Sequence, residues 1–263
     1  MGLKSVVAAS LERAAPRLWL EINIARRNRH YEPEFWLLPA LCDPTQGAVD
    51  VGGNEGVFAY YLSRLSRSVD VFEPNPICLA QIARIHRGNM VVHPVALSDT
   101  AGQATLRFDP RNTGIGTIES ANRLSDNPGI GAVIERDVPV CRLDDFGLTD
   151  VAFIKIDVEG HEPSVLGGAQ RLLDASRPTL LVEIEKRHNA LAFEQVDGLL
   201  RPFDYSAWFL QEAVLRRFSP DDVDRLQVRA TNGDGRYVNN FIFIPERRAG
   251  VLERLARDVR VER

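Results

Sequence analysis

A glycine-rich turn after a short apolar run is the feature that most constrains this chain. Residues 48–56 read AVDVGGNEG, and VDVFEPNP follows at 69–76. Gly52, Gly53 and Gly56 let the backbone turn tightly and bring its amides close to a ligand. Glu73 ends the second apolar run, where a carboxylate can accept both hydroxyls of a ribose. Together these features predict a site for a ribose-bearing cofactor.

Apolar runs alternate with helix-forming segments through most of the chain. Each run is short and apolar enough for a strand buried on both faces, and Pro76 and Pro163 suit the first turn of a helix. This βαβ progression predicts a mostly parallel sheet with helices on both faces. The expected strands are 48–51, 69–73, 90–93, 151–157 and 179–184, and the expected helices are 56–66, 76–87, 163–174 and 189–200.

The two ends of the chain and its middle depart from this rhythm. Residues 5–28 have the spacing of one or two amphipathic helices, and 205–211 and 236–245 read as a closing antiparallel strand pair with a short helix at 219–226 between them. Short strands are expected at 104–108 and 137–140, around a Gly-, Asn- and Ser-rich loop at 112–131. We therefore expect an N-terminal helical extension or lid (1–45), one main domain (46–246) with an acceptor-side loop (109–137), and a C-terminal helix or tail (247–263).

Composition narrows the function classes. The 263 residues are 44% hydrophobic and 26% charged with a net charge of −4, which is ordinary for a globular enzyme and includes no dense basic run for nucleic acid. Three separated cysteines without CxxC spacing indicate neither a zinc site nor a disulfide framework. Glu12, Arg13 and Arg17 interrupt the N-terminal apolar run. We expect a cytoplasmic protein with no membrane insertion, and a homo-oligomer stays open.

The glycine spacing separates two kinds of cofactor. A dinucleotide site uses G-x-G-x-x-G, with a helix N-terminus facing a pyrophosphate. Here the pattern is D-x-G-G-x-x-G, and Asn54 stands where that motif has a glycine. Asp50 before the turn would repel a pyrophosphate and suits a ligand with a cationic amine. The methionine part of S-adenosylmethionine is such a ligand.

A second motif lies where the later strands are expected to end. The run VAFIKID leads into VEGHEP, and TLLVEI follows, so Asp157 and Glu183 end two neighbouring strands at the ligand-binding edge. With these residues in view, the chain resembles the FkbM family of S-adenosylmethionine-dependent methyltransferases. DVGGNEG, VFEPNP, PVALSD, IKIDVEGHE, VLGGA, VEI and NNFIFIP carry the resemblance in this order, across residues 31–245. Glu55 departs from the small or apolar residue usual there, and it is compatible with a helix N-terminus.

The resemblance implies a fold and a reaction. The fold is α/β, a Rossmann-like class I methyltransferase with a seven-stranded, mostly parallel sheet, an antiparallel C-terminal strand and an N-terminal helical extension. The reaction is methyl transfer to a hydroxyl of a saccharide or of a glycosylated or polyketide natural product, with S-adenosylhomocysteine as product. The residues expected to bind the cofactor are Asp50, Gly52, Gly53, Asn54, Gly56, Glu73, Asn75, Ala96, Leu97, Ser98 (or Asp99) and Asp157.

A protonated hydroxyl is a poor nucleophile, so a general base is expected. The candidate catalytic residues are His161, Asp157, Glu183 and His188, with Glu159 and Glu162 as further candidates. The acidic run 157–162 could hold a divalent ion, but alternating side chains point in different directions and no metal is expected. The candidate acceptor contacts are Tyr31, Glu32, Asn112, Gly114, Thr117 and Glu159, with Trp36 beside them.

Three other readings stay open at this point. A nicotinamide-dependent oxidoreductase would share the glycine-rich turn, although the glycine spacing and Asp50 disfavour it. A scaffold that binds the cofactor without catalysis is excluded by no residue. Within methyltransferases, a small-molecule nitrogen acceptor is an alternative to a hydroxyl.

Overall fold

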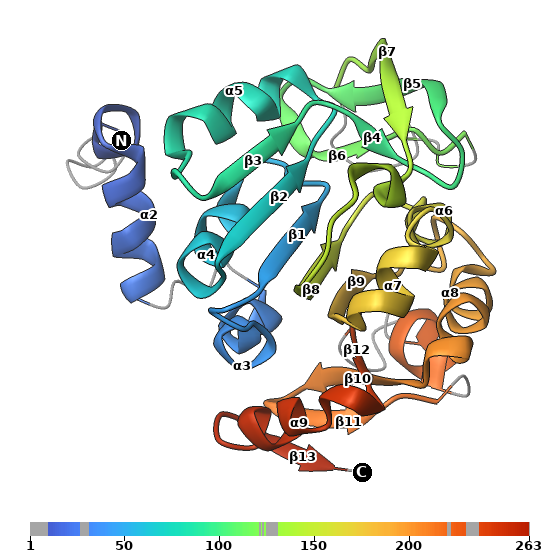
Figure 1. Cartoon of the computed structure of the whole chain (residues 1–263). Coiled ribbons are helices and arrows are strands. Elements are labelled where there is room, and N and C mark those ends of the chain that lie inside the picture. Colours follow the sequence, from blue (N-terminus) through green and yellow to red (C-terminus); the bar gives the residue numbers. More distant parts are fainter. Residues whose placement is uncertain are drawn as a thin grey trace.

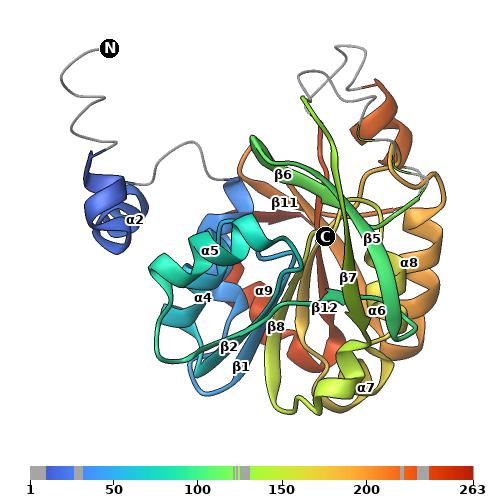
Figure 2. The same cartoon turned by 90° about the horizontal axis from the view of Figure 1, so that it is seen from above.

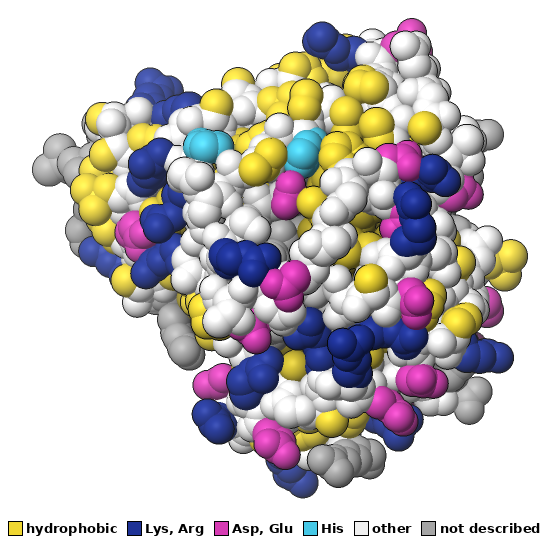
Figure 3. Space-filling view, in the orientation of Figure 1, with side chains coloured by type: hydrophobic (Ala, Val, Ile, Leu, Met, Phe, Trp, Pro, Cys, Tyr) yellow, Lys and Arg dark blue, Asp and Glu magenta, His cyan; other side chains and the backbone are white. Residues whose placement is uncertain are grey.

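The computed structural model describes residues 10–26, 32–120, 122, 124, 131–219, 222–229 and 237–262. A central sheet with helices on both faces makes up most of it, and a smaller sheet lies at one end, next to β8 (Val151–Ile156) and α6 (Glu162–Gly167) (Figures 1 and 2). No helix in these ranges is both long and apolar enough to cross a membrane. Basic and acidic side chains are interspersed on the face shown in Figure 3.

The central sheet has nine strands in the order β13-β11-β10-β12-β9-β8-β1-β2-β3. The five from β3 to β9 are parallel, and β12 runs antiparallel between β9 and β10. The expected parallel core and antiparallel C-terminal strand are therefore confirmed. The strands are β1 (Gly47–Val51), β2 (Ser68–Phe72), β3 (Met90–His93), β8 (Val151–Ile156), β9 (Thr179–Glu183), β10 (Tyr205–Gln211), β11 (Val214–Arg217), β12 (Asn240–Pro245) and β13 (Arg260–Glu262).

Two helical layers cover this sheet because its central strands are apolar on both faces. Every residue of β1, β8 and β12 is buried. One face packs against α3 (Leu38–Leu41), α4 (Val57–Leu65), α5 (Pro76–Ile85) and α9 (Gly250–Leu255). The other packs against α6 (Glu162–Gly167), α7 (Gln170–Ser176) and α8 (Ala192–Leu200).

The expectation of seven strands is wrong, because two further strands extend one edge. The chain leaves β10 through Glu212 and Ala213, both with positive φ (53° and 61°), which is the geometry of a two-residue type I′ hairpin turn. It returns as β11, and β13 pairs with β11 in parallel. The C-terminal segment is therefore η7 (Glu246–Arg248), α9 and an edge strand, rather than a helix or a tail alone.

The expected loop at 109–137 is also partly wrong. β6 (Asn112–Thr117) pairs with β5 (Gly102–Asp109), and β7 (Ile134–Cys141) pairs with β5 and with β4 (Ala96–Leu97). The hairpin turn at Pro110 and Arg111 and the backbone ladder fix β6 as a strand despite its two glycines. These four strands form the small sheet, whose core includes Leu106, Phe108 and Val138.

The expected helix 163–174 is two helices, α6 and α7, separated at Gly168 and Ala169. A Cβ at Gly168 would lie 2.1 Å from the Ser98 carbonyl oxygen, so the chain at the break passes directly against the segment after β4. The short helix expected at 219–226 is found as a π-helical turn at Asp224–Arg229. Residues 220 and 221 lie outside the described ranges.

The N-terminal extension divides into two parts. Helix α2 (Pro16–Ala25) lies beside α4 and α5 (Figure 1), where the Tyr60 hydroxyl donates to Glu21 Oε1 at 2.7 Å. A 3-10 helix, η1 (Pro33–Leu37), then leads into α3. Whether this extension acts as a lid stays a prediction.

Candidate active site

The carboxyl ends of β1, β2 and β8 meet β4 and β6 around one pocket. It contains about 650 Å³ of empty space, counting the part open to solvent. Parallel sheets bind ligands at this edge because the loops that follow the strands diverge there. The lining residues are Val51, Gly52, Asn54, Phe72, Glu73, Pro74, Asn75, Val95, Ala96, Leu97, Leu106, Thr113, Gly114, Gly116, Ile118, Asp157, Val158 and Glu159.

Glu73 forms one polar wall of this pocket. Its Oε2 accepts from the Asn54 amide at 2.8 Å, and its Oε1 accepts from the Asn75 amide at 2.7 Å. Burial raises the pKa of Glu73 to about 7, although the hydrogen bonds from these two amides act to lower it. The two hydrogen bonds from backbone amides fix the orientation of the carboxylate. Its oxygens keep further lone pairs, which can accept hydrogen bonds from the two hydroxyls of a ribose.

Asn75 lines the same pocket and, within the described part of the chain, has an unpaired side-chain donor. Its Oδ1 accepts from the Ile77 amide and caps α5, and the side chain is 2% exposed. Its Nδ2 has no partner among the described residues. A buried unpaired donor costs about 1–3 kcal/mol, which a ligand acceptor can recover. Polar ligand groups therefore fit this wall, while Ala96, Leu97 and Phe72 supply apolar surface for a flat ring.

The three glycines of the turn have different structural roles. Gly52 lines the pocket at φ +78°, and a Cβ there would lie 1.8 Å from the Asp157 carbonyl oxygen. Gly53 and Gly56 do not line the pocket. A Cβ at Gly53 would lie 2.5 Å from Val71, and Gly56 (φ +82°) packs against Ile82 of α5. These two glycines hold the start of α4 close to its neighbours.

Lys155 lies at the centre of the charged groups behind the pocket. It is opposite Asp50 in the β1–β8 register, its Nζ donates to Asp157 Oδ2 at 2.9 Å, and it lies 4.7 Å from the centre of the Phe58 ring. The carboxylates of Asp157, Asp50 and Glu32 raise its pKa above the usual lysine value, against the effect of burial. Lys155 is therefore a buried cation shared by three acids.

Asp50 lies behind the pocket and does not line it. The side chain is fully buried, and neither carboxylate oxygen has hydrogen-bond geometry with a partner among the described residues, although the Ala59 amide approaches. Burial raises the pKa of Asp50 to about 6, and Lys155 partly offsets that effect. Lys155 is therefore the cation that favours the ionised form of Asp50.

Several acids with raised pKa values lie beside Asp157. Burial raises the pKa of Glu159 to about 8, with Asp157 and Glu185 adding to the effect. Burial also raises the pKa of Glu183, and the carboxylates of Asp157 and Glu32 reinforce it. An acid whose pKa is raised towards neutrality, as that of Glu159 is, can exchange protons at working pH, which is typical of catalytic sites.

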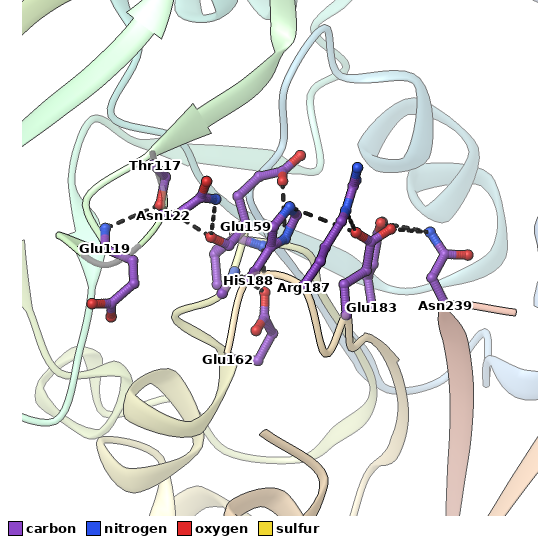
Figure 4. Close-up of polar contacts among 12 residues, drawn as sticks. Thr117, Glu119, Asn122, Glu159, Glu162, Glu183, Arg187, His188 and Asn239 are labelled. Atoms are coloured by element: carbon purple, nitrogen blue, oxygen red, sulfur yellow. Dashed lines mark hydrogen bonds and ion pairs between the residues drawn. The ribbon is translucent and has the colours of Figure 1, made fainter. Parts of the chain in front are cut away.

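The two candidate histidines are both held by acids. His188 Nδ1 lies 3.3 Å from Glu159 Oε2, and burial lowers the pKa of this histidine (Figure 4). His161 Nδ1 lies 3.1 Å from Glu119 Oε2 and its Nε2 lies 2.9 Å from the Ser98 hydroxyl. Neither histidine lines the pocket. His161 instead connects the start of α6 to the small sheet.

The remaining predicted residues fall in several places. The Thr117 hydroxyl and the Asn122 amide donate to the Glu159 carbonyl at 3.1 and 2.8 Å, and so hold a residue with φ +57° (Figure 4). Glu162 accepts from the Gly160 amide at 2.9 Å. Of the other predicted contacts, Gly114 lines the pocket, and the following do not: Asn112, Thr117, Ser98 and Asp99. Glu32 and Trp36 line a second pocket. Tyr31 lies outside the described residues.

Sequence reasoning missed Lys155 and the β6 contribution. Lys155 was detectable as the one charged residue in the run VAFIKI, where a strand buried on both faces needs a partner for it. Thr113 and Gly116 of β6, and Ile118 just after it, close the pocket, and no short sequence motif predicts that packing. Among the described residues, no group of three or more His, Cys, Asp or Glu side chains is arranged to hold a metal ion.

Comparison with known proteins identifies the family. The family model described as the methyltransferase FkbM domain matches residues 50–209, which include the turn, Glu73 and Asp157. The chain belongs to the FkbM methyltransferase family. Membership confirms the resemblance seen in the motifs, the Rossmann-like class I methyltransferase fold and the S-adenosylmethionine cofactor.

Two curated relatives share the FkbM similarity. The 31-O-demethyl-FK506 methyltransferase FkbM of Streptomyces tacrolimicus is 28% identical over 227 residues, 72% of this chain and 83% of the relative. Methyltransferase sdnD of Sordaria araneosa is 29% identical over 152 residues, 46% of this chain. The match spans 59% of that second relative.

Solved structures also align with the chain. The crystal structure of methyltransferase FkbM from Methylobacillus flagellatus KT aligns with a TM-score of 0.48 and 18% identity, over 76% of this chain and 44% of that one. An rRNA methylase from Streptococcus thermophilus aligns with a TM-score of 0.44 and 14% identity, over 81% of this chain and 95% of that one.

Proposed function

We propose that this FkbM-family protein transfers a methyl group from S-adenosylmethionine to a hydroxyl oxygen of a saccharide or a glycosylated or polyketide natural product. One observation carries the proposal. A pocket with a fixed, buried carboxylate and an unpaired buried amide adjoins a second group of carboxylates that can take a proton. The curated relative whose name specifies a 31-O-demethyl substrate supports an oxygen acceptor.

The cofactor binds in the pocket at the ends of β1, β2 and β4. Glu73 accepts the ribose hydroxyls, Asn75 Nδ2 donates to a ring or ribose acceptor, and Ala96 and Leu97 pack against the adenine. Gly52 lets the chain pass close to the methionine part, and Asp157 faces it from the end of β8. When bound, S-adenosylmethionine supplies a methyl group made electrophilic by its sulfonium charge.

Glu183 is the general base in this proposal. It lies at the end of β9, and its pKa is raised by burial, Asp157 and Glu32, so its carboxylate is a stronger base than an exposed one. Glu183 accepts the hydroxyl proton as the oxygen–methyl bond forms and the methyl–sulfur bond breaks, which leaves S-adenosylhomocysteine. The proton then passes to solvent, and activity rises with pH as Glu183 ionises.

Labelled methyl transfer tests this proposal. With S-adenosylmethionine deuterated in its methyl group and a panel of hydroxylated sugars and macrolides, mass spectrometry should find the labelled methyl as an ether. Glu183→Gln should lower kcat by about 10² or more while S-adenosylhomocysteine affinity stays within about twofold. Glu194→Gln on α8 is the matched control. Unchanged kcat in Glu183→Gln removes the base assignment, and label found only on amines favours the nitrogen-acceptor alternative.

The enzyme is proposed to work in the cytoplasm. Its three cysteines, Cys42, Cys78 and Cys141, are free thiols in the structure. Burial raises the pKa of Cys42 and Cys78 to about 12, which suits inert, reduced side chains. Fractionation of the native host, with this protein tracked by antibody, tests the assignment.

A further inference from the structure

A second pocket lies beside the carboxylates, on the opposite side from the cofactor pocket. It is formed by η1, the β10–β11 turn and the residues entering β12, and contains about 1170 Å³ of empty space, counting its open mouth. We propose that this is the acceptor pocket and that it selects an uncharged or cationic polyhydroxylated ring over an anionic one. This inference rests on the proposed methyl transfer. The residues that carry it are Glu32, Glu34, Trp36, Tyr237, Asn239 and Asn240.

Two asparagines connect this acceptor pocket to the proposed reaction centre. Asn240 Nδ2 donates to Glu32 Oε2 at 3.1 Å. Asn239 Nδ2 donates to Glu183 Oε1 at 2.6 Å, as Figure 4 shows. Asp157 lines the cofactor pocket and acts electrostatically on both Glu32 and Glu183. Asp157 thus lines the first pocket and Glu32 the second, while Glu183 lines neither and interacts electrostatically with both carboxylates. An acceptor in the second pocket would present its hydroxyl to Glu183 with the cofactor on the far side.

The walls of the pocket match a hydroxylated ring. Trp36 and Tyr237 offer aromatic surface to the apolar face of such a ring. Carboxylates accept from ring hydroxyls, and the asparagine amides can both donate and accept. Glu34 is 4% exposed, and its carboxyl meets only its own backbone amide among the described residues. A ligand hydroxyl or ammonium would add a second partner to that buried group.

The charge of the pocket sets its preference. Glu32, Glu34, Glu212 and Asp258 line it, and its lining residues in the described ranges include neither lysine nor arginine. A phosphate or carboxylate on the acceptor would lose hydration and meet like charges, whereas an ammonium would lose hydration but meet opposite charges. The acceptor pocket should therefore disfavour sugar phosphates and uronic acids.

Three probes that share one ring and differ in charge test this inference. Methyl α-glucoside, glucosamine and glucose 6-phosphate are titrated by ligand-observed NMR into full-length protein saturated with S-adenosylhomocysteine. Glucosamine and the glucoside should bind with Kd values at least about tenfold below that of the phosphate. Trp36→Ala should weaken both by about tenfold, and Trp19→Ala on α2 should not.

Three other results would each overturn a part of this inference. Equal or tighter binding of glucose 6-phosphate overturns the charge selection. Binding unaffected by Trp36→Ala places the ring elsewhere. No saturable binding of glucosamine or the glucoside up to about 50 mM overturns the assignment of a polyhydroxylated ring. Calorimetry with S-adenosylhomocysteine and the labelled methyl-transfer assay, run first, separate these outcomes from failure of the proposed function, since that failure would appear as lost cofactor binding or as the absence of a labelled ether.

Discussion

At the scale of single residues, Lys155 organises the site more than any acid around it. Its ammonium is almost fully enclosed, with 5% of the side chain exposed, and is shared by Asp157, Asp50 and Glu32. Removing one partner of a buried ion pair leaves uncompensated charge, which costs more than the pair itself contributes. Replacing this lysine should therefore affect both folding and the cofactor pocket.

Lys155→Met should lower the free energy of unfolding by about 3 kcal/mol, because three acids lose their shared cation in a buried setting. Urea denaturation followed by circular dichroism measures it. Lys186→Met is the control: that lysine is 40% exposed and lies 3.6 Å from Asp224, so the loss should be below about 1 kcal/mol. Equal losses for the two variants would contradict the account of Lys155.

The sequence predicts the position, at the pocket, of residues that a backbone feature places there. Glu73 and Gly52 lie in the pocket because a strand end and a tight turn put them there. The sequence does not predict the contacts of Asp50 and Ser98. The position of each residue along its strand does not reveal that Asp50 is opposite Lys155 or that the Ser98 hydroxyl contacts His161. Such contacts depend on which strands become neighbours.

At the scale of elements, the break between α6 and α7 shows how a glycine pair can override a helical pattern. The apolar spacing of 163–174 favours one helix, yet Gly168 lies against the Ser98 carbonyl and the chain restarts at Gln170. The β10–β11 hairpin was equally invisible, because Glu212 and Ala213 occupy positive-φ positions that sequence rules assign to Asn-Gly or Gly. Tertiary packing therefore determines both the break between α6 and α7 and the β10–β11 hairpin.

Gly168→Ala should destabilise the protein by about 2 kcal/mol, because a Cβ 2.1 Å from a backbone oxygen forces α6 away from the segment after β4. Gly198→Ala on α8 has open space around the new Cβ and should stabilise by about 0.5 kcal/mol through helix propensity. Thermal unfolding of the two variants measures the difference. If Gly168→Ala matched Gly198→Ala, the close approach at the break would be refuted.

At the scale of the whole molecule, the concentration of buried acids at one edge of the sheet links stability to pH. The pKa values of Glu34 and Glu73 are raised to about 7 and that of Glu159 to about 8, mainly by burial. Each group binds its proton more tightly in the folded than in the unfolded protein. The stability that these groups contribute is complete below pH 4.5 and is lost as pH rises through 7–8.

The ligand-free protein should therefore lose about 2 kcal/mol of unfolding free energy between pH 6.5 and 8.5. His188, whose pKa is lowered by burial, acts in the opposite direction only below about pH 6.5, where the unfolded chain takes up its proton. Urea titrations at the two pH values measure the loss, and Glu34→Gln should reduce it. Stability that is flat or rises with pH would show that these carboxyls are ionised in the fold.

The central claim is that the pocket at the ends of β1 and β2 binds S-adenosylmethionine through Glu73. Isothermal titration with S-adenosylhomocysteine tests it most directly, with NAD as a competing ligand and Asp145→Asn, on the surface, as a control. We predict micromolar binding by the wild-type protein and the control, at least about tenfold weaker binding by Glu73→Gln, and no heat with NAD. Binding unchanged by Glu73→Gln, or tight binding of NAD with none of S-adenosylhomocysteine, would contradict the account.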